Sequence, residues 1–182
     1  MSLLPLNQFK GIKIFNREIY YSDIGFFLNT FSIDDLESTF VQDSASFSIN
    51  KGTVRGMHFQ LPPYSQAKII NVLQGEIIDF VIDLRPDSDT FLSYGKIKLN
   101  LESPHTIYIP RGFAHGFITM LPNTIVAYKL DNKYSPENER TLLWNDKDIN
   151  IKWPKMEHYF LSSKDQKGSS LKEIKDYLIQ ND

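Results

Sequence analysis

The sequence contains no cysteine among its 182 residues, which excludes disulfide bonds, thiol nucleophiles and thiolate metal ligands. No apolar run reaches the roughly 18 residues of a membrane-spanning helix. The first residues, MSLLPLNQFKGIK, lack the basic flank and apolar stretch of a secretory signal. Long basic runs are also absent and the net charge is −2. We therefore expect a cytoplasmic protein with neither a nucleic-acid nor a membrane partner.

Histidine is scarce, and its spacing bears on metal binding. The segment PRGFAHG, residues 110–116, has the Pro-x-Gly-x-x-His spacing found in the second half of a metal-binding cupin motif. A metal cupin also needs a His-x-His pair and a carboxylate from an earlier strand pair, but the other histidines, at positions 58, 105 and 158, are isolated. Since zinc and iron sites need three or four converging ligands, we expect a jelly-roll cavity without a metal or a cofactor.

Aromatic residues are plentiful, with 13 Phe, 9 Tyr and 2 Trp in short apolar runs separated by Gly, Pro, Asn and Asp. This pattern is typical of a β-rich domain. Helical periodicity is confined to the neighbourhood of 33–37 and to a tail at about 169–180. We predict one domain over 1–182: an all-β, jelly-roll (cupin-like) antiparallel β-barrel with short peripheral helices and a C-terminal helix. The expected strands are 11–21, 39–49, 53–59, 67–73, 76–84, 94–101, 105–110, 115–121 and 124–131.

Several polar residues fall where the apolar pattern points toward a core. Lys68 shares a strand face with Ile70 and Val72, so it either snorkels to water from the strand end or borders a polar cavity. His58, which follows a glycine that permits a β-bulge, could equally be a satisfied structural histidine. Tyr128 could be a packed aromatic and Asp165 a turn or capping aspartate. Taken singly, each residue fits a structural role at least as well.

The strand EIIDFVIDL, residues 76–84, alternates apolar and more polar side chains. Its apolar set is Ile78, Phe80, Ile82 and Leu84, and we interpret this set as the inner face of the strand.

Ordered segments along nearly the whole chain resemble the dTDP-4-dehydrorhamnose 3,5-epimerase family of nucleotide-sugar epimerases. The matching segments are GFF (25–27), FVQD (40–43), VRGMHFQ (54–60), AKIINVLQGEIIDFVIDLR (67–85), IPRGFAHGF (109–117), AYK (127–129), YSPENER (134–140), LLWNDKDINIKWP (142–154) and LSSKDQKG (161–168). The resemblance implies a jelly-roll cupin that acts without a cofactor, usually as a homodimer with strands exchanged across the interface. It also implies a nucleotide-diphosphate sugar as substrate and a surface-polysaccharide or related glycan pathway.

Carried over to matching positions, the resemblance makes His58 the general base and Asp165 the carboxylate that orients it. Lys68 would lie beside the C4 oxygen of the sugar, and Tyr128 would be the general acid on the opposite ring face. The substrate-binding positions implied are Phe26, Asn29, Gln42, Arg55, Gln60, His115, Tyr134, Glu139 and Lys164.

These residue types suit the chemistry of a 4-keto sugar. Hydrogens on C3 and C5 are acidic because the C4 carbonyl takes up the charge as an enolate. An imidazole titrates near neutral pH and can remove such a proton, and a lysine can stabilise the enolate oxygen. Inversion then requires a proton from the other face, which a tyrosine can supply.

The match breaks where the family contacts the nucleotide. The family's arginine before GFF and glutamate after it are Ile24 and Asn29 here, and Ser44 and Ala45 follow FVQD in place of asparagine and histidine. Asn71 replaces a common arginine. We therefore expect epimerisation at C3, C5 or both on a 4-keto-6-deoxy sugar, a hexose or a heptose, with guanosine diphosphate as a candidate carrier. The alternatives are a single-centre epimerase, a ketoisomerase of the same fold and a non-catalytic sugar-binding cupin.

Overall fold

The computed structural model describes all of the chain except residues 1, 33, 35, 37–38 and 181–182. The expected helical turn near 33–37 falls largely on residues outside this described part. The strands are β1 (Lys13–Asn16), β2 (Ile19–Ser22), β3 (Gly25–Leu28), β4 (Gln42–Ser48), β5 (Val54–Gln60), β6 (Lys68–Gln74), β7 (Glu76–Asp83), β8 (Tyr94–Asn100), β9 (His105–Ile109), β10 (Phe113–Thr119), β11 (Thr124–Leu130) and β12 (Glu139–Thr141). The helices are the 3-10 turn η1 (Leu6–Gln8), α1 (Ser163–Gln166) and α2 (Leu171–Gln180). None of the helices described here has the length and apolar character needed to cross a membrane.

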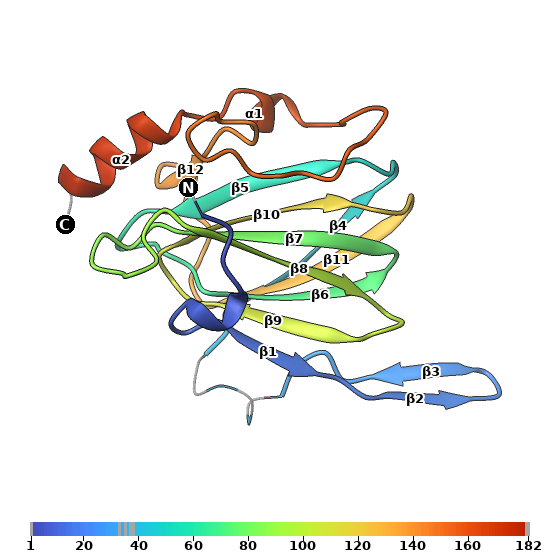
Figure 1. Cartoon of the computed structure of the whole chain (residues 1–182). Coiled ribbons are helices and arrows are strands. Elements are labelled where there is room, and N and C mark those ends of the chain that lie inside the picture. Colours follow the sequence, from blue (N-terminus) through green and yellow to red (C-terminus); the bar gives the residue numbers. More distant parts are fainter. Residues whose placement is uncertain (1, 33, 35, 37–38, 181–182) are drawn as a thin grey trace.

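Two five-stranded antiparallel sheets face each other and form the barrel (Figure 1). One sheet has the order β12-β5-β10-β7-β8 and the other has the order β1-β9-β6-β11-β4. Strands that are neighbours in a sheet are mostly far apart in sequence, as in a jelly roll. The predicted antiparallel cupin-like β fold with a C-terminal helix is confirmed.

The barrel interior holds one of two apolar cores. Ile70 and Val126 from one sheet meet Ile77 and Phe117 from the other, and each of these side chains is almost fully buried. Burying one such side chain contributes about 1.5–3 kcal/mol, so this core holds the two sheets together. It fills only part of the space between the sheets, and mainly polar residues line the remainder.

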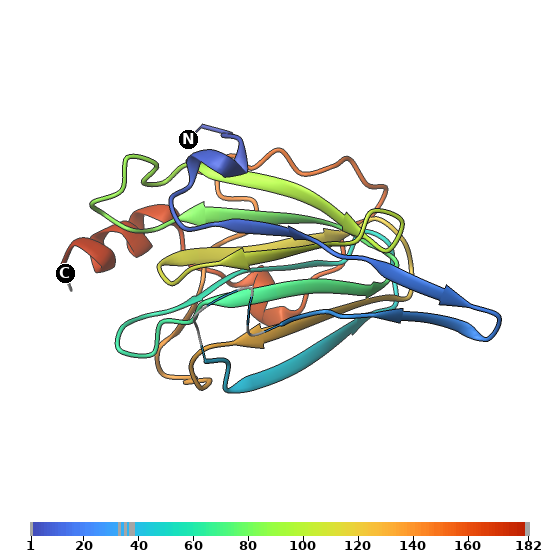
Figure 2. The ribbon, with the colours of Figure 1, turned by 90° about the horizontal axis from the view of Figure 1, so that it is seen from below.

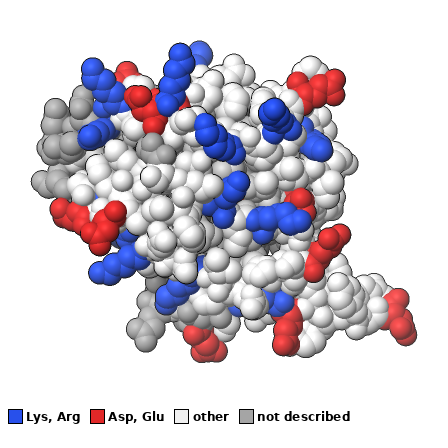
Figure 3. Space-filling view, viewed as in Figure 1, with Lys and Arg blue, Asp and Glu red and all other residues white. Residues whose placement is uncertain are grey.

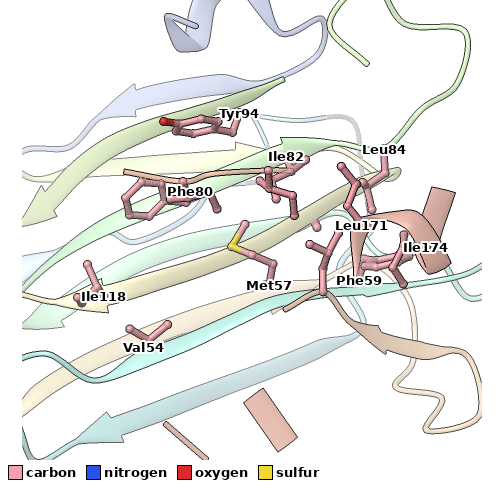
Figure 4. Close-up of a cluster of buried hydrophobic side chains, with 14 of the residues drawn as sticks. Val54, Met57, Phe59, Phe80, Ile82, Leu84, Tyr94, Ile118, Leu171 and Ile174 are labelled. Atoms are coloured by element: carbon pink, nitrogen blue, oxygen red, sulfur yellow. The ribbon is translucent and has the colours of Figure 1, made fainter. Parts of the chain in front are cut away.

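The second core lies on the outer face of the β12-β5-β10-β7-β8 sheet, beneath the C-terminal segment (Figure 4). Phe80 and Ile82 of β7 and Met57 of β5 pack there with Leu171 and Ile174 of α2. The interpretation of the apolar set of β7 as its inner face is therefore wrong. Because the C-terminal segment covers the outside of this sheet, both faces of β7 are buried, and its more polar set faces the barrel interior.

A two-stranded arm made of β2 and β3 extends beyond the barrel (Figures 1 and 2). The prediction of one strand over 11–21 is wrong, because β1 pairs with β9 in the barrel while β2 pairs with β3 in a separate two-stranded sheet. The arm exposes large apolar side chains, including Tyr21, Ile24 and Phe27. Figure 3 shows a mostly uncharged arm beside a body on which charges of both signs are interspersed.

Candidate active site

A cavity of about 240 Å³ opens between the two sheets. His58 on β5 and His115 on β10 enter it from one sheet, and Lys68 on β6 and Tyr128 on β11 enter it from the other. The cavity thus brings together groups that lie far apart in the sequence. Its lining residues are Gln42, Arg55, His58, Gln66, Lys68, Ile70, His115, Phe117, Tyr128, Leu130, Tyr134 and Glu139.

His58 and Asp165 form a dyad at one wall of the cavity. The Nε2 atom of the partly exposed His58 lies 2.6 Å from Oδ1 of the buried Asp165. Ser162 caps α1 and donates its hydroxyl to Asp165 Oδ2 at 2.7 Å. Burial favours the neutral carboxyl, but hydrogen bonds from His58 and Ser162 outweigh it and lower the pKa of Asp165. The dyad therefore holds an anionic carboxylate against one imidazole nitrogen and leaves the other nitrogen for a ligand.

Gly56 allows β5 to bring His58 into this position. The register between β5 and β10 shifts by one residue next to His115, as the glycine in RGMHF suggested. Gly56 has φ +119°, and a Cβ there would lie 2.5 Å from the Cα of Gly116. Its backbone N–H also donates to Asp165 Oδ1 at 3.3 Å. No other residue fits this backbone conformation and close approach without strain.

Lys68 lies at the base of the cavity, at the start of β6. Its ammonium group donates to the backbone carbonyl of His58 at 3.3 Å. Burial lowers the pKa of Lys68 to about 8, although the carboxylates of Glu139 and Asp79 act in the opposite direction. The structure therefore resolves the alternatives for this residue: Lys68 borders a polar cavity and does not snorkel to bulk water.

Tyr128 faces the two histidines from the opposite sheet. It shares a strand face with the buried Val126 and with Leu130, as the alternation of TIVAYKL predicts. Within the described residues its hydroxyl makes no hydrogen bond, so the hydroxyl is free to donate to a bound molecule.

A second histidine–aspartate pair is formed by His115, which lines the same cavity, and a buried aspartate next to it. His115 Nε2 is 2.6 Å from Oδ1 of Asp79, which is 1% exposed on β7. Burial raises the pKa of Asp79, and His115 opposes this effect. The sequence analysis did not identify Asp79. The sequence does show that an aspartate interrupts the apolar strand 76–84. This observation indicates a cavity residue only when the interior face of β7 is known.

At the cavity, Glu139 forms an ion pair with Lys164 and a hydrogen bond with Tyr134. Glu139 Oε2 lies 2.5 Å from Lys164 Nζ and accepts a hydrogen bond from the half-exposed Tyr134 hydroxyl at 2.6 Å. Burial favours the neutral carboxyl, but Lys164 and Tyr134 outweigh it and lower the pKa of Glu139. The resulting cluster presents a phenol ring and charges of both signs to a ligand.

Three other expected binding residues have defined roles near the cavity. Arg55 donates to the Ser48 hydroxyl at 3.1 Å and to the Phe47 carbonyl at 3.0 Å. Gln42 lines the cavity from β4. Gln60 is buried and its side chain bonds to backbone groups, including the N–H of the residue after Tyr134. Gln60 therefore fixes the loop that presents Tyr134.

Phe26 and Asn29 lie outside this cavity. Phe26 is exposed on β3, and Asn29 follows that strand at the base of the arm. The sequence analysis also missed apolar lining residues, although their signal was present: Ile70 alternates with Lys68, Phe117 with His115, and Leu130 with Tyr128.

The described residues contain no group of three or more His, Asp and Glu side chains arranged to hold a metal ion. The cavity instead offers two imidazole–carboxylate pairs, one ammonium group and one phenol. Such a set can remove a proton from carbon, stabilise an oxyanion and return a proton.

The sequence profile of the family described as dTDP-4-dehydrorhamnose 3,5-epimerase matches residues 7–173. The Shigella flexneri dTDP-4-dehydrorhamnose 3,5-epimerase is 38% identical over 178 residues, which cover 94% of this chain and 97% of that protein. The crystal structure of the Bacillus anthracis enzyme, with TDP and PPi bound, has a TM-score of 0.83 and 40% identity over 88% of this chain and 94% of its own.

The Legionella pneumophila dTDP-6-deoxy-D-glucose-3,5-epimerase, in complex with dTDP-4-keto-L-rhamnose, has a TM-score of 0.87. It is 33% identical and covers 97% of this chain and 95% of its own. Sequence and fold therefore agree along nearly the whole chain, and the protein belongs to the dTDP-4-dehydrorhamnose 3,5-epimerase family.

Proposed function

We propose that this protein inverts C3 and C5 of a nucleotide-diphosphate-linked 4-keto-6-deoxy sugar through an enolate. The observation that carries this proposal is the placement of His58 and Tyr128 on facing sheets of one cavity, which Lys68 also lines from the sheet that carries Tyr128. We propose that one domain carries out the reaction, and that side chains of the protein supply the acid, the base and the oxyanion donor.

His58 is the general base of the proposed reaction. It takes the proton from C3 or C5, and the electron pair of the broken C–H bond moves into the C4 carbonyl to give an enolate. Asp165, whose pKa is lowered by its hydrogen bonds with His58 and Ser162 against the effect of burial, stabilises the imidazolium that forms. Proton transfer of this kind accelerates a reaction about 10²–10⁴-fold.

Lys68 stabilises the enolate oxygen with its ammonium group. In a dry cavity a preorganised cation is a strong donor, and removing one oxyanion donor costs about 10²–10³-fold in rate. Tyr128 then protonates the carbon from the other face of the ring, which inverts the centre. The tyrosinate recovers its proton from solvent and the imidazolium returns its proton to solvent, so the cycle closes without a net change.

The nucleotide end of the substrate would lie toward the mouth of the cavity. Arg55, which lines the cavity, would bind the diphosphate, and the ring of Tyr134 would contact the base beside Glu139 and Lys164. His115 and Gln42 complete the sugar pocket, and Gln60 acts through the loop that it fixes.

We propose a homodimer in which the arm of one protomer reaches the cavity of its partner. The arm cannot serve the cavity of its own chain, because Phe26 is exposed outside the lining. An apolar arm with Ile24 99% exposed needs a covering surface. The resemblance to strand-exchanged dimers and the expected roles of Phe26 and Asn29 both fit this arrangement.

A second candidate function keeps this reaction and changes the nucleotide. The named relatives act on thymidine-linked sugars, and two of the solved structures above contain TDP or a dTDP sugar. In this chain, however, Ile24, Asn29 and Ser44 replace the family's residues at the nucleotide end, whereas His58 and Tyr128 are kept. A guanosine diphosphate hexose or heptose is therefore the alternative substrate.

A panel of nucleotide 4-keto sugars in deuterated water tests both candidates. Deuterium entering C3 and C5 with inversion of both centres supports the 3,5-epimerase, and exchange at one centre only supports a single-centre epimerase. Turnover of the thymidine-linked sugar alone rules out the second candidate. No exchange with any sugar overturns the proposal and favours a sugar-binding protein.

A further inference from the structure

Asp79 is a buried carboxylate that the reaction above does not use. Its Oδ1 pairs with His115, but its Oδ2 is buried and has no hydrogen-bond partner within the described residues. Leaving a buried polar atom unpaired costs about 1–3 kcal/mol. A carboxylate kept at such a cost needs a further explanation.

Asp83 shows what a purely structural aspartate looks like on the same strand. It lies four residues further along β7, on the same interior face, and is fully buried. Arg85, Ser88 and Thr90 all donate to its carboxylate at 2.6–3.0 Å. The strand therefore carries one aspartate whose oxygens are both satisfied and one that pairs with a cavity-lining histidine and keeps an unpaired oxygen.

The cations that compensate Asp79 belong to the cavity. Burial raises the pKa of Asp79, and the charges of His115 and Lys68 oppose this effect. Burial likewise lowers the pKa of Lys68, and the negative charge of Asp79 opposes that effect. Asp79 and Lys68 thus stabilise each other's charged forms from opposite sheets, although no hydrogen bond joins them.

Building on the proposed function, we propose that Asp79 is a positioning residue for the epimerase reaction: it fixes His115 through Nε2 and keeps a negative charge opposite the Lys68 ammonium. With Nε2 held, Nδ1 of His115 is the nitrogen left to contact the sugar. With the counter-charge in place, Lys68 stays protonated while the enolate oxygen forms.

The Asp79→Asn variant removes the charge and keeps the shape. We expect the pH at which Lys68 loses its proton to fall by about one unit. The basic limb of the pH profile of kcat/KM should move to lower pH by the same amount as the Lys68 titration. The fold decrease in kcat should exceed the fold increase in KM. A 15N titration of the Lys68 amine measures the first effect without substrate. The other groups around Lys68 are unchanged in this variant: Arg55 and His58 on β5, His115 on β10, Tyr128 on β11, Tyr134 before β12, Glu139 on β12 and Lys164 on α1.

Asp83→Asn is the matched control, because it removes a second buried carboxylate from the same face of β7. We expect it to lower stability without moving the Lys68 titration. If Asp79→Asn and the wild type have the same Lys68 titration and the same basic limb, the inference is overturned.

A measurement on the wild-type protein covers the case in which Asp79→Asn does not fold. Long-range 1H–15N spectra should show neutral His115 protonated at Nε2, and a proton on Nδ1 instead would overturn the inference. These spectra and the lysine titration need no turnover. If the protein exchanges no sugar proton, the proposed function is refuted, but the spectra and the titration still test whether Asp79 positions His115 and Lys68.

Discussion

His58 and His115 are register partners on the adjacent strands β5 and β10, and each binds a buried aspartate through Nε2 at 2.6 Å. The two pairs share a geometry but differ in their surroundings. Hydrogen bonds from His58 and Ser162 lower the pKa of Asp165 against the effect of burial, whereas burial raises the pKa of Asp79. The first pair is therefore suited to stabilise an imidazolium, which is why we assign the base to His58.

The first prediction concerns His58→Asn. The variant should lose deuterium incorporation at C3 and C5 by about 10²–10⁴-fold, because it removes the proposed general base. His105→Asn is the control, since His105 lies on β9 outside the cavity and bonds to Ser103. Mass spectrometry of sugar recovered from deuterated water gives the rates. Normal exchange in His58→Asn would mean that the base is misassigned.

Tyr128→Phe should separate proton loss from inversion. Without the phenol the enolate still forms, so exchange at the original face continues while delivery of a proton to the other face slows. Tyr159→Phe serves as control, because its hydroxyl bonds to the Pro154 carbonyl away from the cavity. NMR of the product gives the ratio of inverted to exchanged sugar. An equal loss of both processes would point to another acid.

The rate should fall above pH about 8, because burial lowers the pKa of Lys68 to about 8 from its ordinary 10.5. The protonated form is the oxyanion donor, so activity is present below this pH and is lost as pH rises through it. In Lys68→Arg the guanidinium stays charged, and any residual activity should lack this limb. A kcat/KM profile from pH 6 to 10 tests the assignment, and a limb that persists in Lys68→Arg contradicts it.

Lys68 should also lower the stability of the protein at neutral pH. Because the folded pKa lies below the unfolded one, the unfolded chain binds more protons between pH 8 and 10.5, and stability rises with pH in this window. Lys68→Met should therefore be inactive yet more stable by about 1–2 kcal/mol at pH 7. Urea unfolding at pH 7 and pH 10 should show this advantage shrinking. A variant less stable than the wild type at pH 7 would contradict the expectation.

Alternating apolar residues were enough to predict most barrel strands, because strands such as β5, β6, β7 and β10 have at least one buried face. The inner face of β7 could not be predicted, since both of its faces are covered and the covering segment lies more than 60 residues away in sequence. The break between β1 and β2 had a local signal, because Asn16, Arg17 and Glu18 interrupt the apolar run, and the two strands pair with different partners, β9 and β3.

The residues of the candidate site also differ in how far the sequence could predict them. Lys68 stood out because an ammonium group on an apolar face is costly, and Gly56 because strands tolerate glycine poorly. His58, Tyr128 and Asp165 looked structural one at a time, and the family resemblance joined them. Asp79 was missed because its meaning depends on which histidine of the adjacent strand β10 its side chain contacts.

The last prediction concerns the arm. Ile24 is 99% exposed in the β2–β3 turn, so Ile24→Arg should leave the free energy of unfolding within about 0.5 kcal/mol of the wild type. If the arm reaches a partner's cavity, the added guanidinium meets the diphosphate, and one charge-assisted hydrogen bond of about 1.5–3 kcal/mol tightens binding roughly 10–100-fold. Leu121→Arg, which adds the same charge at an exposed loop away from the arm, is the control. Calorimetry with thymidine diphosphate gives Kd for each protein. Equal Kd values for the two variants would mean that the arm does not reach the nucleotide.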